Sequence, residues 1–195
     1  MQRTLLIAIV ALSSACAFTE DRVHLTYMPM DRPGHLSGAE SVVATVDIRD
    51  ARSDRTRVSV KKNGYGIEMA AIRSDAPVER VVLSAVETEL RNRGVKLNNA
   101  GNIVVAVEVT RFWNDFKMGM FSGDAVADFQ LNVQVRRPAG AVLFVRNYSV
   151  SGDERGIQLA SGANAELALD RALEAGIHQV FDDQAFLNAI VPSSS

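Results

Sequence analysis

Apolar and polar side chains alternate with a period of two along several stretches of the chain, as they do in β-strands with one buried face. The longest such stretch runs from Ala125 to Arg136, and a second covers residues 42–49. Residues 103–113 are rich in valine, and residues 142–150 follow a turn at 137–140. The pattern predicts strands in all four places, with the strands on either side of the turn paired as an antiparallel hairpin.

Two segments show the 3.6-residue period of amphipathic helices. In the first, Ser74, Asp75 and Pro77 are typical of a helix start and Gly94 of a helix end. Its buried face is predicted to hold Val78, Val82, Ala85, Val86 and Leu90, and its exposed face Glu79, Glu87, Glu89, Arg91 and Arg93. The second helix is predicted over residues 164–180, with a buried stripe at Leu169, Ala172, Leu173, Ile177 and Val180. A short last helix, capped by Asp182 or Asp183, is expected to end at Ile190.

These elements together predict an α+β domain. Asn63-Gly64 is typical of a tight turn and adds a hairpin of two short strands at residues 58–61 and 65–72. A mainly antiparallel sheet of about five or six strands then has the two longer helices packed on one face, because amphipathic strands need one face covered. Residues 41–191 are assigned to this domain, with a polar loop at 152–162 and a frayed tail at 192–195.

The start of the chain has the order of a bacterial lipoprotein signal. A basic residue precedes an apolar run from Leu5 to Leu12, small residues follow, and then comes Cys16, the only cysteine of the chain. The run is too short to span a bilayer, which takes about 20 residues. Residues 1–15 are therefore predicted to be a signal peptide that is removed before a lipidated Cys16. Residues 16–40, with two prolines and no sustained period, are predicted to form a lipidated N-terminus and a flexible tether.

An alternative is ordinary signal cleavage after Ala17. Ala15-Cys16-Ala17 has the small-x-small form, and Ser13 stands where lipoprotein signals carry an aliphatic residue. The lipoprotein interpretation predicts an outer-membrane protein that faces the periplasm, and the alternative predicts a soluble periplasmic protein. A lone cysteine cannot form an intrachain disulfide, and attachment of a lipid removes the free thiol.

Composition and motifs argue against several function classes. Lys and Arg number 21 against 23 Asp and Glu, so the chain lacks the basic excess of a nucleic-acid-binding surface. His24, His35 and His178 lie far apart and without metal-ligand spacing. The chain has no Gly-x-Ser-x-Gly motif and no phosphate-binding glycine loop. We therefore expect no catalytic residue, no metal, no cofactor and no nucleic-acid partner, and a protein that is not an enzyme.

Two segments are candidates for a contact surface. Residues 112–121, between two predicted strands, are unusually apolar for a loop, so they either cap the core or contact a protein or a lipid. The candidate contact residues there are Trp113, Phe116, Met118, Met120 and Phe121. The flexible Met side chain adapts to varied partners, and Trp suits an interface that is partly exposed to water. The alternating charges between Asp47 and Arg57 indicate either a solvated turn with local ion pairs or a polar contact surface.

The order of elements, read with certain motifs, resembles the YajG-like family of bacterial envelope lipoproteins over residues 41–190. The motifs are the signal ending at Cys16, Asp47-Ile-Arg49, Leu90-Arg-Asn-Arg-Gly-Val95 and Tyr148-Ser-Val-Ser-Gly152. The resemblance implies an outer-membrane lipoprotein of unestablished biochemical role. It offers no known cofactor or catalytic residues to carry over, and only Cys16 transfers, as the lipidated residue. A more distant similarity is to auxiliary lipoproteins of lipid-transport systems.

Two hypotheses for function follow. The first is a non-enzymatic envelope lipoprotein, anchored in the outer membrane by acylated Cys16, that acts by binding another envelope protein. The alternative is a lipid- or ligand-binding auxiliary module of an envelope lipid-transport system. That alternative requires an apolar pocket between helix and sheet, opening near Phe116–Phe121.

Overall fold

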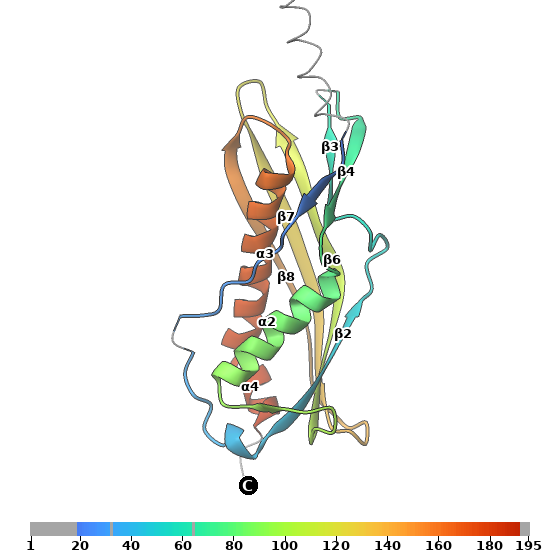
Figure 1. The fold of residues 1–195 in the computed structure, drawn as a ribbon. Helices are drawn as coiled ribbons and strands as arrows, with labels where there is room; N and C mark the ends of the chain where they lie inside the picture. The colour runs from blue at the N-terminus through green and yellow to red at the C-terminus, as the bar shows by residue number, and fades with distance from the viewer. Residues whose placement is uncertain (1–18, 32, 64, 192–195) are drawn as a thin grey trace, which may run out of the picture.

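Both long helices lie on one face of a single large sheet, which confirms the α+β class (Figure 1). The computed structural model describes residues 19–31, 33–63 and 65–191. The strands are β1 (Asp21–Val23), β2 (Val43–Asp50), β3 (Ser59–Lys62), β4 (Glu68–Ser74), β5 (Lys96–Leu97), β6 (Ile103–Met118), β7 (Gly123–Arg136) and β8 (Val142–Ile157). The helices are α2 (Val78–Asn92), α3 (Gly162–Asp182) and α4 (Gln184–Ile190), with a 3-10 turn, η2, at Ala39–Ser41. Within the described residues the sheet has eight strands rather than five or six, because β1 and β5 are too short to show a period.

Three long antiparallel strands, β6, β7 and β8, form the main part of the sheet. The other edge of β6 is shared between two strands that run parallel to it. β2 pairs with β6 as far as Val109, and β3 meets β6 at Asn114. The register of β6 against β7 shifts between Val109 and Arg111, at the point where β6 changes partner. β5 extends the sheet beyond β2, and β4 and then β1 extend it beyond β3.

Two strands are longer than the sequence predicted. β6 continues to Met118 and β8 to Ile157, so half of the predicted 152–162 loop is strand, as is most of the predicted aromatic loop. β7 pairs with both neighbours along its whole length. A continuous partner satisfies the backbone N–H and C=O groups whatever the side chains are, so segments with an irregular side-chain pattern still join the ladder.

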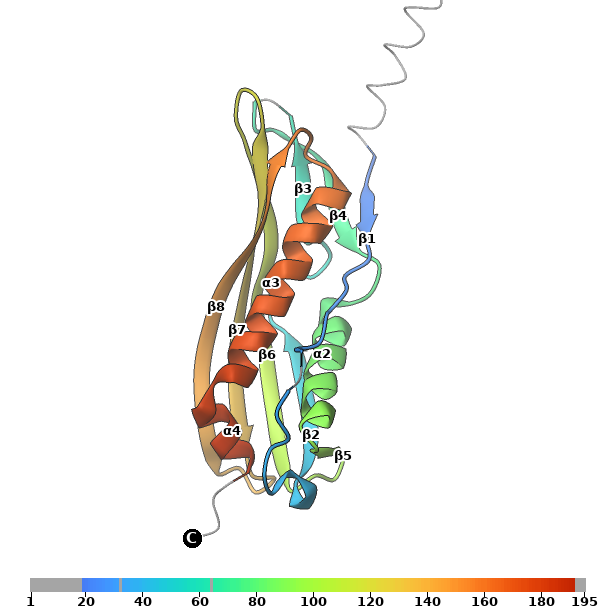
Figure 2. The same ribbon diagram turned by 90° about the vertical axis from the view of Figure 1, so that its left-hand side faces the viewer.

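The apolar residues predicted on the buried faces of α2 and α3 are buried, on the side of each helix that packs against the sheet (Figure 2). The buried apolar residues on these faces are Val78, Val82, Ala85, Val86, Leu90, Leu169, Ala172, Leu173, Ile177 and Val180. α2 ends before Gly94, whose φ of 89° favours glycine. Of the two predicted caps of α4, Asp183 accepts a hydrogen bond from a backbone N–H 2.9 Å away. At the start of α2 the N-cap is Pro77, and neither Ser74 nor Asp75 caps the helix.

The structure corrects the tether prediction for the described part of residues 16–40. β1 pairs in parallel with β4, and the apolar side chains of Val23 and Leu25 are buried in the core. The backbone N–H groups of His24 and Thr26 donate to the side chains of Glu166 and Asp170 of α3, both at 2.9 Å. Burial of alternate apolar side chains therefore holds this segment on the domain. Cys16, the signal peptide and the tail at 192–195 lie outside the described residues.

A second correction concerns Glu89 and Arg93, which were predicted on the exposed face of α2 and are buried. Glu89 accepts hydrogen bonds from the Tyr27 hydroxyl (2.8 Å) and the Met30 N–H (3.0 Å), and it forms an ion pair with Arg93. The Arg93 guanidinium lies 4.7 Å from the centre of the Phe181 ring of α3. Burial, together with the hydrogen bond to Glu89, raises the pKa of Tyr27. The N-terminal segment and α3 thus cover a helix face that its sequence alone marks as polar.

Candidate functional site

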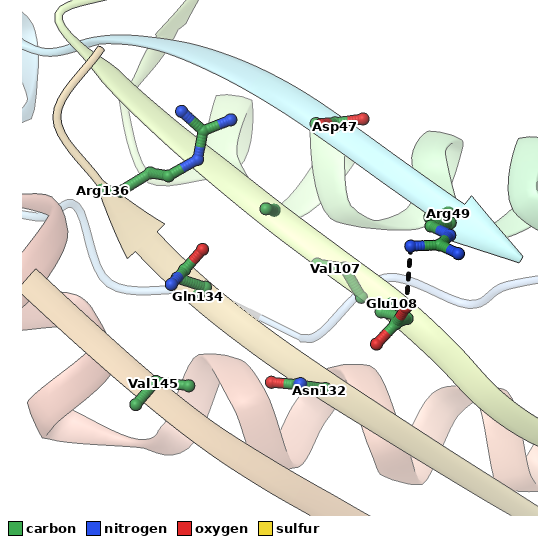
Figure 3. A pocket seen from close by; sticks show the side chains of 9 residues that line it. Asp47, Arg49, Val107, Glu108, Asn132, Gln134, Arg136 and Val145 are labelled. Carbon is green, nitrogen blue, oxygen red and sulfur yellow. Dashed lines mark ion pairs between the residues drawn. The ribbon is translucent and has the colours of Figure 1, made fainter. Parts of the chain in front are cut away.

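The face of the sheet opposite the helices carries the candidate site. On this outer face Asp47 and Arg49 of β2, Glu108 of β6, and Gln134 and Arg136 of β7 surround a shallow hollow of about 320 Å³ (Figure 3). Arg49 and Glu108 form an ion pair at 3.5 Å across the two strands. Amides and charges of both signs make this a hydrogen-bonding surface, and no nucleophile stands beside a base in it.

A second hollow, of about 540 Å³, lies further along the same face, between β6, β7 and the turn after β2. Trp113 forms part of it, and the Arg57 guanidinium lies 5.7 Å from the centre of the Trp113 ring. Arg57 also pairs with Asp54 at 2.5 Å and with Glu68 at 3.2 Å. The hydrogen bond from Arg57 holds the pKa of Asp54 well below its usual range, although partial burial opposes the shift. The structure thus brings the two predicted contact segments, the charged turn and Trp113, into one hollow.

The charged turn is built around a buried ion pair and is not solvated throughout. Asp50 and Arg52 have side chains that are each 5% exposed, and they form an ion pair at 2.8 Å. The Arg52 guanidinium also donates to the backbone carbonyls of Arg55 and Arg57, and to that of Phe112 on β6. A buried guanidinium with all these acceptors fixes the loop backbone. The turn therefore presents its exposed side chains from a fixed position beside the sheet.

The aromatic segment divides three ways. Phe112 and Phe116 point into the core and are 1% and 8% exposed, so Phe116 belongs to the core. Trp113, one residue on from Phe112, is half-buried on the outer face because successive strand residues point to opposite faces. The end of β6 exposes Met118, and the turn after it exposes Met120 and Phe121, at 45%, 91% and 86%. The segment predicted as one contact loop is thus a core strand, a sheet-face residue and an exposed tip.

The histidines stay apart, as their spacing indicated. His24 pairs with Asp75 at 2.7 Å, and this hydrogen bond raises the pKa of His24. His35 approaches Glu40 at 3.8 Å, and His178 packs edge-on against Tyr27. In the part of the chain that the structure describes, no group of three or more His, Cys, Asp and Glu side chains is placed to hold a metal ion.

α3 packs directly against the sheet. A Cβ added to Gly176 of α3 would lie 2.4 Å from the Phe129 ring of β7, and one added to Gly152 of β8 would lie 2.3 Å from the backbone N of Ala172 in α3. Such distances leave no layer of space between helix and strands. The apolar pocket that a lipid carrier needs is therefore missing where α3 crosses β7 and β8.

Residues of the outer face that sequence analysis did not single out come mainly from β7. They are Gln130, Asn132, Gln134 and Arg136, the polar members of its alternating pattern. The signal was present in the sequence, because polar positions of period two mark a strand face that is not buried. Which other strands share that face depends on the tertiary pairing.

Comparison with solved structures defines the class of fold. Protein XCC0632 from Xanthomonas campestris, of family DUF330, aligns with a TM-score of 0.56 and 14% identity over 84% of this chain and 92% of its own. A minor lipoprotein from Acinetobacter baumannii aligns with a TM-score of 0.44 and 9% identity over 73% and 91% of the two chains. Lipoprotein GNA1162 from Neisseria meningitidis gives 0.40 and 12%, over 72% and 98%. The first of these shows the shared fold.

The chain belongs to a family of uncharacterised lipoproteins, whose model matches residues 33–191. That range covers the sheet from β2 onward and helices α2, α3 and α4. Comparison with curated proteins finds no match. Across the described ranges, none of the helices has the length and apolar character needed to cross a bilayer.

Proposed function

We propose that this protein is a non-enzymatic envelope lipoprotein, held at the outer membrane by acylated Cys16, that acts by binding another envelope protein through the outer face of its sheet. Membership of a lipoprotein family supports the anchor, together with the signal-like order of residues 1–16. The motifs ending at Val95 and Gly152 favour a YajG-like lipoprotein in particular.

The anchor follows from the chemistry of Cys16. A thioether-linked diacylglycerol with a further acyl chain gives two or more lipid signals, whereas a single short chain binds a membrane only marginally. Cys16→Ser should therefore move the protein from the membrane fraction to the soluble fraction. Intact mass of the membrane form should show a mature chain that begins at Cys16 and carries lipid. A chain cleaved after Ala17 and free of lipid would refute the anchor and leave a soluble periplasmic protein.

The observation that carries the binding role is the contrast between the two faces of the sheet. The helices cover one face, and the other is open along β2, β6 and β7. Ion pairs cross this face, among them Arg49–Glu108 at 3.5 Å and Arg111–Asp128 at 3.1 Å. A polar face with arginines around a half-buried Trp113 has the chemistry of a protein interface, where aromatic and arginine side chains carry most of the binding energy.

Site-specific photocrosslinking in cells tests this role. A photoreactive side chain at position Gln134, in the hollow of the outer face, should give a defined adduct with an envelope protein (Figure 3). The matched control is Gln179, an exposed glutamine of α3 on the opposite side of the sheet, which should give none. Arg136→Glu should remove the Gln134 adduct because it reverses the charge beside the contact. Equal labelling at both positions, or no adduct at Gln134, would contradict the proposal.

The lipid-carrier alternative finds less support. It needs an apolar space between helix and sheet, and the contacts of Gly152 and Gly176 leave none where α3 crosses β7 and β8. The two hollows of the outer face are lined mainly by polar and charged side chains, which do not suit an acyl chain. An enzyme would need polar groups that converge with a nucleophile and a base, and the outer face brings no such set together.

A further inference from the structure

Large apolar side chains are exposed together at one end of the sheet, here called the tip. They come from the turn between β6 and β7, the turn between β3 and β4, and the chain after β8. Its members are Tyr65 (91% exposed), Ile67 (60%), Met118 (45%), Met120 (91%), Phe121 (86%) and Leu159 (68%). Among the residues that the structure describes, the four most exposed large apolar side chains all belong to the tip. Apolar side chains in this number on one end indicate a contact rather than chance exposure.

The strand registers place these three segments at the same end of the sheet. β3 runs parallel to β6 with Ser59 opposite Asn114, so the turn after β3 lies beside the end of β6. β8 runs antiparallel to β7 with Ile157 opposite Gly123, the first residue of β7. The chain after β8 therefore lies beside the β6–β7 turn. Both views of the ribbon show the turns at one extremity of the long axis, with the β7–β8 turn at the other (Figures 1 and 2).

The N-terminus of the described chain reaches the tip as well. β1 runs parallel to β4 with Asp21 opposite Ile72, so the chain before β1 points back toward the β3–β4 turn. The Lys61 ammonium of β3 donates to the Thr19 carbonyl at 3.0 Å and pairs with Asp21 at 2.7 Å. On the other side Glu20 pairs with Arg73 of β4 at 3.1 Å. The chain is therefore tied to the sheet up to Thr19.

Cys16 stands three positions before Thr19 in the sequence. Three residues span at most about 11 Å when fully extended. A lipid on Cys16 therefore brings the bilayer surface to the tip, and the domain has no length of chain with which to stand away from it. This geometry replaces the expectation of a tether that holds the domain off the membrane.

We infer that the tip rests on the membrane surface, with Met120 and Phe121 in the boundary between headgroups and acyl chains; this inference rests on the proposed acylation of Cys16. The β6–β7 turn suits such a site because it closes its own backbone hydrogen bond, Gly119 N–H to Ser122 O at 2.9 Å, and contains no charged residue. Lys117 is exposed at the end of β6, opposite Asp124 of β7, so the two charges beside the turn balance. The long axis of the sheet then points away from the bilayer, and the outer face stays open to a partner.

A fluorescent probe at the tip tests the contact. Because Cys16 is the only cysteine and an acylated thiol does not react with maleimide, Met120→Cys gives one labelling site for the fluorophore NBD. The matched control is Ala139→Cys, in the exposed β7–β8 turn at the far end. The full lipidated chain is placed in vesicles of phosphatidylethanolamine and phosphatidylglycerol. At position 120 the emission should shift to the blue and be quenched by doxyl-labelled lipids, and at position 139 it should do neither.

Three outcomes are distinguished. Quenching at 120 and not at 139 supports the contact, and Phe121→Asp should then abolish most of it, whereas Val142→Asp near the far end should not. If the chain binds vesicles but the probe at position 120 is quenched no more than the probe at position 139, the tip contact is overturned and the anchor stays intact. A parent chain that itself reacts with maleimide has a free Cys16, so the anchor fails and the tip inference fails with it.

Discussion

Glu89→Ala should lower the free energy of unfolding by about 3–5 kcal/mol, the range for removing one partner of a buried ion pair. The side chains of Glu89 and Arg93 are 0% and 5% exposed. Loss of the carboxylate leaves the guanidinium buried without a counter-charge. It also removes the acceptor of the Tyr27 hydroxyl and of the Met30 N–H. Because domains of this size are stable by about 5–15 kcal/mol, the expected loss is a large share of the total.

Arg93 retains some compensation in this variant, which keeps the expected cost within that range. Its guanidinium still lies over the Phe181 ring at 4.7 Å and donates to the Glu89 backbone carbonyl at 3.2 Å. Urea denaturation at pH 7.5, followed by circular dichroism, measures the change. The matched control is Glu87→Ala, which breaks an exposed ion pair of the same spacing with Arg91 and should cost about 0.3–0.5 kcal/mol.

The double variant Glu89→Leu with Arg93→Met separates charge from packing. Replacing both buried ions with apolar side chains should recover the part of the loss that comes from the unpaired charge, and leave the part that comes from the Tyr27 and Met30 donors. A Glu89→Ala variant within about 1 kcal/mol of the parent would refute the reasoning. Such a result would mean that water reaches Arg93, and therefore that residues 27–30 do not seal this face of α2.

Three further changes test the packing and the charges. Burial raises the pKa of Asp170 from 3.8 to about 6, with Glu166 and Glu174 adding to the shift, so its ionisation opposes folding as the pH rises through that window. Asp170→Asn should therefore raise stability at pH 7.5 by about 1–2 kcal/mol after allowance for solvent screening, with no gain below pH 4, in urea denaturation. Gly176→Ala should cost about 1–3 kcal/mol in the same assay, because α3 cannot approach the sheet with a Cβ at that position. Phe116→Ala should cost about 3–5 kcal/mol and Trp113→Ala about 1 kcal/mol or less, seen as a large and a small fall in Tm.

Each of these has an outcome that contradicts it. A gain for Asp170→Asn that is equal at pH 4 and pH 7.5 would mean that the charge plays no part. An unchanged Gly176→Ala variant would show that α3 has room above the sheet, which would revive the pocket of the lipid-carrier hypothesis. A larger fall in Tm for Trp113→Ala than for Phe116→Ala would place the indole, rather than the phenyl ring, in the core.

The side-chain pattern was sufficient for the elements that repeat a simple period. The alternation over 125–136 predicted β7, and the apolar stripe of α3 predicted the helix face that is buried. Hydrophobic periodicity reports how an element will be buried when one face meets a core and the other meets solvent. The end of α2 was predictable for a local reason as well, since Gly94 takes a backbone conformation that other residues avoid.

Periodicity was a poor guide where an element is covered by segments distant in the sequence. The sequence predicted Glu89 and Arg93 on a solvent-exposed face because the polar face of a helix normally contacts water. Only the packing of residues 23–30 and α3 buries them. The end of β8 read as a loop because its side chains do not alternate cleanly, yet the unbroken edge of β7 supplies it with backbone partners. In both cases the deciding interaction is a long-range one.

For the candidate site, the sequence by itself determined which residues are chemically suited to a contact: an acylatable Cys16, the charged turn, Trp113 and the apolar residues up to Phe121. Only the tertiary structure decided how they are grouped. The pleat sends Trp113 to the outer face and Phe116 to the core, and the parallel pairing of β3 with β6 brings the charged turn beside Trp113. Strand pairing also sets the β3–β4 and β6–β7 turns beside the start of the described chain, because hydrogen-bond register, unlike side-chain pattern, joins segments that the sequence keeps far apart.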